Sequence, residues 1–339
     1  MTCFGNEAAK VGPLQVRFSG AILLRGTDRS KDMSRTLVAH IALFTVNLIY
    51  GVNYVVAKGL MPEVIGPSGF ILLRVLGAGT LYWLLRAFRP EPVASQDLFR
   101  LFLCGVFGVA LNQLMFFNGL MRTTPINASI IMVATPILVL VMSGLLLGER
   151  ITWTKTAGVA LGAAGALTLI FLKPQGTRAG ASTLGDLYIL INASSFAIYL
   201  VVVKPLMSKY SAITVMAWSF LVGVLLVTPF GWNELARVEW RVLSLPVWSA
   251  MTFVVVMVTF AAYLLNTWAL GEVNATVVGT YIYMQPVLAA VFTWAFMRLG
   301  PERLGIPGEY ASALGWPQLV CAAAIFTGVH LVSRTTADR

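Results

Sequence analysis

Four polar side chains lie on one face of the first long apolar segment, where they could hydrogen-bond a polar molecule. Asn47, Tyr50, Asn53 and Tyr54 recur at spacings of three and four residues, so a helix presents them on one side. A polar stripe in an apolar helix is typical of a water-filled path, and we favour that interpretation. The alternative is hydrogen bonding between helices, which asparagine often supplies in membrane bundles.

Later apolar segments carry polar side chains at comparable depth. Aromatic rings with a polar tip suit amphipathic molecules, although such rings also occur near helix ends at the membrane interface. We therefore predict a central binding site to which the later segments contribute Asn112, Gln113, Tyr263, Asn266, Tyr281 and Gln285.

Charge inside the apolar segments is sparse and basic. Arg74 could pair with a substrate carboxylate, or it could bind a helix-terminal carbonyl or extend to the interface, and the structural role is the stronger expectation. Lys58 and Lys204 stand at segment ends, where binding to terminal carbonyls is the simpler role. Glu149 is expected to pair with its neighbour Arg150 at the membrane surface.

Several kinds of chemistry are not indicated. Glu63, Asp186 and Glu272 all fall near segment boundaries, which leaves no candidate for a proton relay at depth. The two histidines, His40 and His330, have no other ligand-type residue beside them in the sequence. We therefore expect no cofactor, no metal site and no enzymatic activity.

Two prolines interrupt apolar segments. Pro136 and Pro286 lack an amide hydrogen and clash with the carbonyl four residues earlier, so we predict kinks that free the carbonyls of Met132 and Ile282. The kinks could act as hinges beside a substrate or could simply shape the helices.

The elements that must position these side chains are membrane helices. Hydrophobic residues make up 58% of the chain and charged residues 11%, and the mean hydropathy is +0.81, which excludes an ordinary soluble domain. The basic residues, which give a net charge of +10, lie mainly between apolar runs, so nucleic acid is not an expected partner. About 20 apolar residues are needed per span, and this length predicts ten helices near 36–58, 67–88, 98–120, 124–147, 153–172, 184–204, 211–230, 246–269, 273–297 and 313–333.

The chain contains an internal repeat. Residues 119–136 (GLMRTTPINASIIMVATP) align without a gap with residues 269–286 (ALGEVNATVVGTYIYMQP), and VVAKGLM at 55–61 recurs as VVVKPLM at 201–207. A duplicated unit with an odd number of spans places its copies in opposite orientations, as in many carriers. We therefore predict an all-α polytopic membrane protein with ten transmembrane helices in two inverted five-helix repeats.

The predicted boundaries follow from this division. Residues 1–35 form a cytoplasmic tail, interpreted as disordered, with Met33 as an alternative start; 36–172 form the first repeat; 173–183 form a linker; 184–333 form the second repeat; and 334–339 form a C-terminal tail. Basic residues of the first half gather on one side of the membrane, at Lys31, Arg35, Arg86, Arg89, Arg100, Arg150 and Lys155. This bias predicts cytoplasmic N- and C-termini in the cell (inner) membrane.

Small residues mark the last span of each repeat. Gly158, Gly162 and Gly165 lie in the fifth span, and Ala322 to Ala324 with Gly328 lie in the tenth. Such residues allow close approach of helices. We interpret the two spans as a scaffold, and a homodimer face is the alternative.

The sequence resembles the EamA branch of the drug/metabolite transporter superfamily over residues 36–333. The resemblance is carried by NLIYGVNYVVAK in the first span, by Arg74 in FILLRVLGAG, by the small residues and proline of the fourth span, and by the following GER. It implies ten helices in two inverted halves around a central pathway, and export or exchange of small metabolites, often amino acids.

We therefore expect a carrier that moves a small polar or amphipathic metabolite, with amino-acid-like compounds and export favoured, by alternating access. Its partners are the small-molecule substrate and the lipid bilayer. A nearer alternative is an anion exchanger for phosphorylated sugars that uses Lys58, Arg74 and Lys204 as phosphate ligands. A membrane-embedded enzyme would require His, Asp, Glu or Cys clustered at depth, and the sequence offers none.

Overall fold

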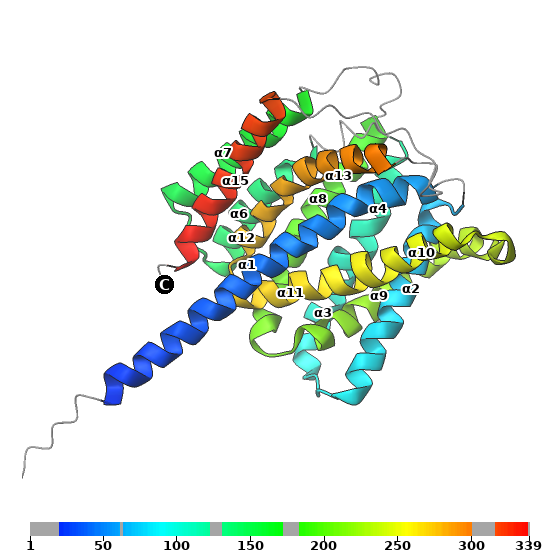
Figure 1. Cartoon of the computed structure of the whole chain (residues 1–339). Helices are drawn as coiled ribbons and strands as arrows, with labels where there is room; N and C mark the ends of the chain where they lie inside the picture. Colours follow the sequence, from blue (N-terminus) through cyan, green and yellow to red (C-terminus); the bar gives the residue numbers. More distant parts are fainter. Residues whose placement is uncertain (1–19, 62–63, 123–130, 172–182, 300–315, 338–339) are drawn as a thin grey trace, which may run out of the picture.

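The computed structural model describes residues 20–61, 64–122, 131–171, 183–299 and 316–337, and every regular element in these ranges is a helix (Figure 1). The α-helices are α1 (Gly20–Leu60), α2 (Pro67–Phe88), α3 (Leu98–Gly105), α4 (Leu111–Leu120), α6 (Ala134–Leu147), α7 (Trp153–Phe171), α8 (Thr183–Val203), α9 (Ala212–Ala236), α10 (Leu245–Phe253), α11 (Ala262–Glu272), α12 (Ala275–Thr280), α13 (Gln285–Leu299) and α15 (Trp316–Ala337). Short helical turns connect or interrupt them, namely η1 (Ser95–Asp97), η2 (Val106–Ala110), η3 (Lys204–Ser208), η4 (Trp240–Val242), η5 (Val254–Ala261) and η6 (Tyr281–Met284).

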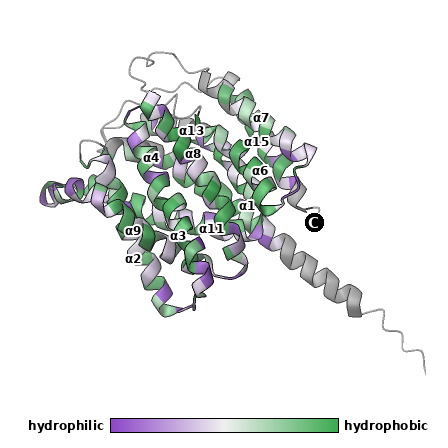
Figure 2. Cartoon of the chain, turned by 180° about the vertical axis from the view of Figure 1, so that it is seen from behind, coloured by the Kyte–Doolittle hydropathy of each residue, from purple (hydrophilic) through white to green (hydrophobic). Residues whose placement is uncertain are grey.

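The helices have the length and the surface of membrane spans. In the described part of the chain, six stretches are long and apolar enough to cross a bilayer: Ser34–Asn53, Pro67–Phe88, Ser95–Leu120, Thr183–Ser208, Ala212–Ala236 and Leu245–Glu272. Figure 2 shows apolar residues along most helices of the bundle. Large apolar side chains that are exposed include Leu85, Leu145, Leu225, Phe230 and Val320, which is unfavourable in water and expected in lipid. The protein is therefore a helical, multi-pass membrane protein.

Helix α1 begins earlier than predicted. It starts at Gly20 and runs without a break to Leu60, so residues 20–32, interpreted from the sequence as part of a disordered tail, continue the first span as helix. The segment after Gly20 contains no proline, and its alanine, leucines and arginines are strong helix formers. Figure 1 shows this end of α1 projecting from the bundle. Residues 1–19 lie outside the described part.

Two spans contain a π-helical segment. η2 interrupts the span made by α3 and α4, and η5 interrupts the span made by α10 and α11. The sequence predicted unbroken helices there, because VFGVA and VVVMVTFA are apolar at nearly every position and so carry no periodic signal that an inserted residue could disturb. π-Helical turns are rare and are frequent at functional sites.

The two prolines follow short interruptions of the α-helical pattern within backbone that stays helical on both sides. Val133 forms a turn before α6, so Pro136 falls in the first turn of that helix. Similarly, the 3₁₀ turn η6 precedes α13, which places Pro286 in the first turn. Because proline has no amide hydrogen to bond the carbonyl four residues earlier, the α-helical pattern is interrupted about one turn before each of the two prolines.

Helices α2 and α9 pack side by side, and each has its N-terminus bound by a glutamate from the far end of the other. Glu234, in the last turn of α9, accepts a hydrogen bond from the Gly69 amide of α2 at 2.8 Å. Glu91, which follows α2, accepts from the amide and hydroxyl of Ser211, the N-cap of α9, at 3.1 and 2.8 Å. A carboxylate at a helix N-terminus is stabilised by the free amides and the helix dipole.

Helices α7 and α15 form a second tight pair, in agreement with the predicted packing of small residues (Figure 1). A Cβ atom added to Gly158 would lie 2.8 Å from the Gly328 carbonyl oxygen, and one added to Gly328 would lie 2.6 Å from that of Gly158. Only glycine fits at this crossing. Both faces are therefore used inside the chain.

Candidate functional site

The polar face of α1 points into the bundle. Val46 and Ile49 pack on Val258 and Ala262 of η5 and α11, whereas Gly51 lies against α13. The part of the α1 surface between these two contacts faces the interior of the bundle. Asn47 and Tyr50 lie on that part of the surface.

Asn47 and Asn53 of α1 each have a side-chain oxygen that accepts no hydrogen bond from the described residues. Asn47 is 3% exposed and donates through Nδ2 to the Leu43 carbonyl of its own helix at 2.7 Å, so that bond does not join helices. The Oδ1 atoms of Asn47 and Asn53 are buried and have no hydrogen-bond partner. The side chain of Tyr54 lies outside the described part of the chain.

Arg74 lies inside the bundle in a cage of aromatic rings. It is 3% exposed, and its guanidinium carbon lies 5.4 Å from the Phe70 ring centre and 5.0 Å from that of Phe117. Its Nε donates to Thr259 Oγ1 at 2.9 Å, whereas Nη1 is buried without a partner. Among the described residues, no Asp or Glu is within salt-bridge distance of Arg74.

The partner of Arg74 belongs to the π-helical segment η5. Thr259 donates from its hydroxyl to the Val254 carbonyl, five residues earlier, at 2.8 Å. Tyr82, two turns beyond Arg74 on α2, donates to the Phe260 carbonyl at 2.6 Å. The side chains of α2 therefore bind the irregular backbone of η5. Sequence reasoning missed Tyr82 and Thr259, and the only available signal was the two-turn spacing of Arg74 and Tyr82.

Gln113 of α4 lies level with Arg74. The rings of Phe70 and Phe117 pack edge to face with centres 5.4 Å apart, and α2 and α4 belong to consecutive spans that run in opposite directions. Arg74 follows Phe70 by one turn on α2, and Gln113 precedes Phe117 by one turn on α4. Because the two helices run in opposite directions, both side chains lie on the same side of the contact between the rings. Gln113 is 2% exposed, and neither its Oε1 nor its Nε2 has a hydrogen-bond partner.

The neighbouring Asn112 contributes its backbone to packing. Its carbonyl accepts a hydrogen bond from Asn192 Nδ2 of α8 at 2.8 Å, a contact that the sequence did not predict. The Asn112 side chain is half-buried.

Two tyrosines complete the surroundings of Arg74. The side chains of Tyr50 and Tyr263 are close enough to interact electrostatically with the guanidinium. The Tyr263 ring packs on Phe220 with centres 5.5 Å apart. We call the group formed by Tyr50, Arg74, Gln113, Thr259 and Tyr263, with the rings of Phe70 and Phe117, the Arg74 cluster. Asn266, one turn beyond Tyr263 on α11, is half-buried.

Tyr281 is directed to another part of the bundle. Its hydroxyl lies 2.9 Å from Nδ1 of His40, and the two rings stack with centres 5.9 Å apart. His40 precedes Tyr50 by ten residues on α1, or about 15 Å along the helix axis. The structure therefore does not bring Tyr281 to the Arg74 cluster. Gln285 is half-buried at the start of α13, and the side chain of Pro286 lies outside the described part.

A second buried charged group surrounds Glu149. Gly148 ends α6 in the left-handed conformation, with φ of 64°, and the chain then turns Glu149 toward α12. Its Oε1 accepts from the Ala275 amide at 3.0 Å, and its Oε2 accepts from the Thr276 hydroxyl at 2.8 Å and from Lys155 Nζ at 3.3 Å. We call Glu149, Lys155 and Thr276, with Ser143 bonded to Thr276 at 2.9 Å, the Glu149 cluster.

The predicted pairing of Glu149 with Arg150 is wrong. Arg150 is exposed, whereas the Lys155 and Glu149 side chains are 2% and 8% exposed and pair with each other. The free amides at the start of α12 attract the carboxylate away from the surface.

Lys204 binds carbonyls, as predicted, but those of another helix. Its Nζ donates to Val273 O at 2.6 Å and to Leu270 O, at the C-terminal end of α11. The junction between α11 and α12 is therefore bound by Lys204 on one side and by Glu149 on the other. The side chain of Lys58, the sequence equivalent of Lys204, lies outside the described part.

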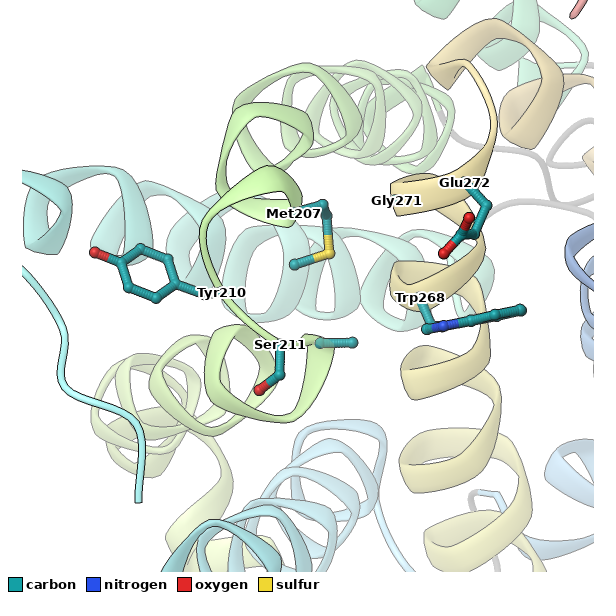
Figure 3. A pocket seen from close by; sticks show the side chains of 7 residues that line it. Met207, Tyr210, Ser211, Trp268, Gly271 and Glu272 are labelled. Atoms are coloured by element: carbon teal, nitrogen blue, oxygen red, sulfur yellow. The ribbon is translucent and has the colours of Figure 1, made fainter. Parts of the chain in front are cut away.

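A small pocket lies beside this junction (Figure 3). It encloses about 190 Å³, and its lining comprises Met207, Tyr210, Ser211, Ala212, Trp268, Gly271 and Glu272. In Figure 3 the Tyr210 ring points away from the other side chains, and its hydroxyl donates to Asp97 at 2.8 Å. The volume is below the range of typical ligand pockets.

Metal chemistry has no candidate ligands in the described ranges. No group of three or more His, Cys, Asp or Glu side chains could hold an ion there. Cys104 and Cys321 are buried free thiols in the membrane helices.

Comparison with known proteins gives consistent matches. The sequence model of the EamA-like transporter family matches residues 37–171 and again residues 183–306. An uncharacterized transporter of Archaeoglobus fulgidus is 24% identical and covers 78% of this chain and 90% of its own length. A probable terminal-alkyne amino-acid exporter of Streptantibioticus cattleyicolor is 24% identical, with coverage of 72% and 76%. One crystal structure shares the fold with a TM-score of 0.67 at 19% identity, covering 90% of this chain and 98% of its own.

Proposed function

The chain belongs to the EamA-like transporter family, and we propose that it moves small polar or amphipathic metabolites across the membrane by alternating access. Amino-acid-like compounds are the favoured substrates, and export is the favoured direction. The amino-acid exporter among the relatives supports this choice of substrate.

One observation carries the proposal. Buried polar groups on α1, α2 and α4, namely Asn53 Oδ1, Arg74 Nη1 and the Gln113 amide, have no hydrogen-bond partner among the residues that the structure describes. Polar groups in such a place are costly unless protein, water or a substrate binds them. A transported molecule that reaches the bundle interior would supply the missing partners.

We further propose ten spans in two inverted five-helix repeats. The family model matches the chain twice, and helices occupy the described parts of all ten predicted ranges. The π-helical segments η2 and η5 stand in equivalent spans, and α2 and α9 bind each other's N-termini through Glu91 and Glu234. Each of these observations supports a pseudo-twofold relation between the halves.

In this scheme the substrate path is lined by side chains from both halves. The proposed lining residues are Asn47, Tyr50, Asn53, Tyr54, Arg74, Asn112, Gln113, Tyr263, Asn266, Tyr281 and Gln285. Pro136 and Pro286, at the starts of α6 and α13, are the proposed hinges about which the halves rock. The N- and C-termini face the cytoplasm, and the membrane is the inner membrane of the cell.

The phosphorylated-sugar alternative receives less support from the geometry. Lys204 binds carbonyls at Leu270 and Val273, whereas Arg74 binds Thr259, eleven residues before Leu270 in the same span. Eleven helical residues extend about 16 Å. The two cations therefore cannot bind one phosphate group in this structure.

Transport is tested with the purified full-length chain in liposomes. Vesicles loaded with one unlabelled amino acid at a time are diluted into labelled amino acid, and exchange is compared with that of empty vesicles. Labelled phosphorylated sugars are measured in parallel. The proposal expects exchange of at least one amino acid, and absence of exchange for every compound would contradict it.

The lining is tested by cysteine labelling. A membrane-impermeant thiol reagent should modify Tyr54→Cys, Asn112→Cys and Gln285→Cys, and a bound substrate should slow the reaction. Leu145→Cys, on the exposed apolar surface, is the matched control and should not respond to substrate. Protection of none of the three lining positions would contradict the proposed path.

A further inference from the structure

The Arg74 guanidinium is a buried cation without an anionic partner in the described part of the chain. A charge at membrane depth is costly, and an opposite charge normally offsets the cost. In the described part of the chain the guanidinium contacts the Thr259 hydroxyl, at 2.9 Å, the faces of Phe70 and Phe117, and the neighbouring Tyr50 and Tyr263 side chains, none of which carries a full negative charge. Its Nη1 remains unused. The positive charge of Arg74 is therefore not offset by a negative charge in the described part of the chain.

Two neighbouring helices leave amide groups unused close to this cation. In Gln113, which is level with Arg74, neither the donor Nε2 nor the acceptor Oε1 has a hydrogen-bond partner among the described residues. The acceptor Oδ1 of Asn53, one turn from Tyr50 on α1, has none there either. Buried polar groups in folded proteins are nearly always hydrogen-bonded. Arg74, Gln113 and Asn53, on three neighbouring helices, each have a polar atom without a partner among the described residues, and a guest molecule between these helices would supply those partners.

The single charge of Arg74 and its distance from Lys204 indicate which class of molecule the cluster would bind. One cation with a free Nη1 matches the single negative charge of a carboxylate, to which it donates a charge-assisted hydrogen bond. A phosphate ester carries close to two negative charges and calls for a second cation, and Lys204 is about 16 Å away by helical rise. The free oxygens of Gln113 and Asn53 suit the N–H groups of an amine.

On the premise that the chain is a transporter, we propose that the Arg74 cluster binds the carboxylate of a small zwitterionic substrate. Nη1 of Arg74 and Nε2 of Gln113 donate to the carboxylate. The amide oxygens of Gln113 and Asn53 accept from the amino group, and the rings of Phe70 and Phe117 exclude water from the pair.

The test is ligand binding by the purified full-length protein, measured as thermal stabilisation against concentration. The twenty amino acids and a set of phosphorylated sugars are screened first. The amino acid that binds best is then compared with its amide, which lacks the carboxylate charge, and with its decarboxylated amine. Loss of charge-assisted hydrogen bonds predicts that both bind on the order of 30-fold more weakly.

Variants then assign the effect to residues. Arg74→Lys keeps the charge but cannot bond Thr259 and the carboxylate from two separate nitrogens as Nε and Nη1 do, and we expect about 30-fold weaker binding of the amino acid. Gln113→Leu should weaken binding about tenfold, and it tests the proposal independently if Arg74 variants fail to fold. Arg86→Gln is the matched control, because Arg86 is also on α2 and stacks on Trp83 and Trp218; its affinity should equal that of the wild type.

The outcomes separate this proposal from transport itself. Equal binding of the amino acid and its amide, or unchanged affinity in both Arg74→Lys and Gln113→Leu, would overturn the carboxylate assignment. Binding of phosphorylated sugars in place of amino acids would also overturn it while leaving transport intact. A protein that binds none of the compounds and exchanges none in liposomes would overturn both proposals.

Discussion

The Arg74 cluster and the Glu149 cluster are both buried and both contain a charged side chain, but they differ in how completely that charge is satisfied. Glu149 accepts three hydrogen bonds, from the Ala275 amide, the Thr276 hydroxyl and Lys155. Among the described residues Arg74 donates to one acceptor, Thr259, and neither its Nη1 nor the Gln113 amide has a hydrogen-bond partner. The first cluster needs no further partner, whereas the second does.

The difference indicates separate roles for the two clusters. A fully satisfied network fixes the position of helices, and Glu149 joins the end of α6 to the starts of α7 and α12. An unsatisfied network is costly in the empty protein and is stabilised by a ligand. Stability measurements should therefore respond in opposite directions when the two clusters are made apolar.

The largest expected effect is loss of the Glu149 charge. Glu149→Gln leaves Lys155 buried without its carboxylate, which costs about 3 kcal/mol in comparable buried pairs. The melting temperature of the purified protein in detergent should fall by several degrees. Arg150→Gln, a change at the exposed neighbour, should leave it unaltered.

A double variant sharpens this prediction. Lys155→Met in the Glu149→Gln background removes the orphaned charge and should restore part of the lost stability. A Glu149→Gln protein as stable as the wild type would mean that the two clusters do not differ in the way proposed.

The next effect is loss of the Tyr82 hydroxyl, which binds η5 beside Arg74. Tyr82→Phe leaves the Phe260 carbonyl, now bonded at 2.6 Å, without its side-chain donor, at a cost of about 1–2 kcal/mol. A drop in melting temperature smaller than that of Glu149→Gln is expected. Tyr188→Phe, at a half-buried ring below Arg122, is the control, and an equal drop in both variants would contradict the assignment.

Much of the fold follows from patterns that are local in the sequence. Apolar runs of about 20 residues predicted the membrane helices, and the spacing of small residues predicted that α7 and α15 each approach a neighbouring helix closely, without showing which one. The position of Lys204 at a segment end predicted its binding to terminal carbonyls. Each of these depends on one helix or on a short motif.

The missed contacts join residues far apart in the chain. Glu149 binds Thr276, His40 binds Tyr281, and Tyr82 binds Phe260. Periodicity shows which face of a helix is polar, but it does not show which helix lies opposite. The sequence therefore predicted that Arg74 and Gln113 face the interior region without predicting that they lie level, and it placed Tyr281 in the same site although the structure separates them.

An effect of opposite sign is expected at Gln113. Gln113→Leu replaces an unsatisfied buried amide with an apolar side chain of similar volume, so the ligand-free protein should become more stable by about 1 kcal/mol. Asn192→Leu is the contrasting variant, since Asn192 donates to the Asn112 carbonyl at 2.8 Å, and it should lower stability. Destabilisation by Gln113→Leu would show that its amide is satisfied in the folded protein.

The smallest effect concerns Glu91, a capping carboxylate like Glu149 but near the surface. Burial tends to raise the pKa of Glu91, but hydrogen bonds from Thr214 and Ser211 outweigh it, and the pKa is lowered overall. Because the folded-state pKa lies below the unfolded one, the stabilisation is present at neutral pH and is lost as the pH falls through the folded pKa.

Because Glu91 is near the surface, solvent screening limits its contribution at the N-terminus of α9 to about 0.5 kcal/mol of the free energy of unfolding. Glu91→Gln should therefore lower the melting temperature only slightly at neutral pH, and the difference from the wild type should vanish in acid. Glu239→Gln, at an exposed glutamate, corrects for the loss of one surface charge. A difference that persists unchanged into acid would mean that Glu91 stabilises α9 by packing rather than by charge, unlike the carboxylate of Glu149.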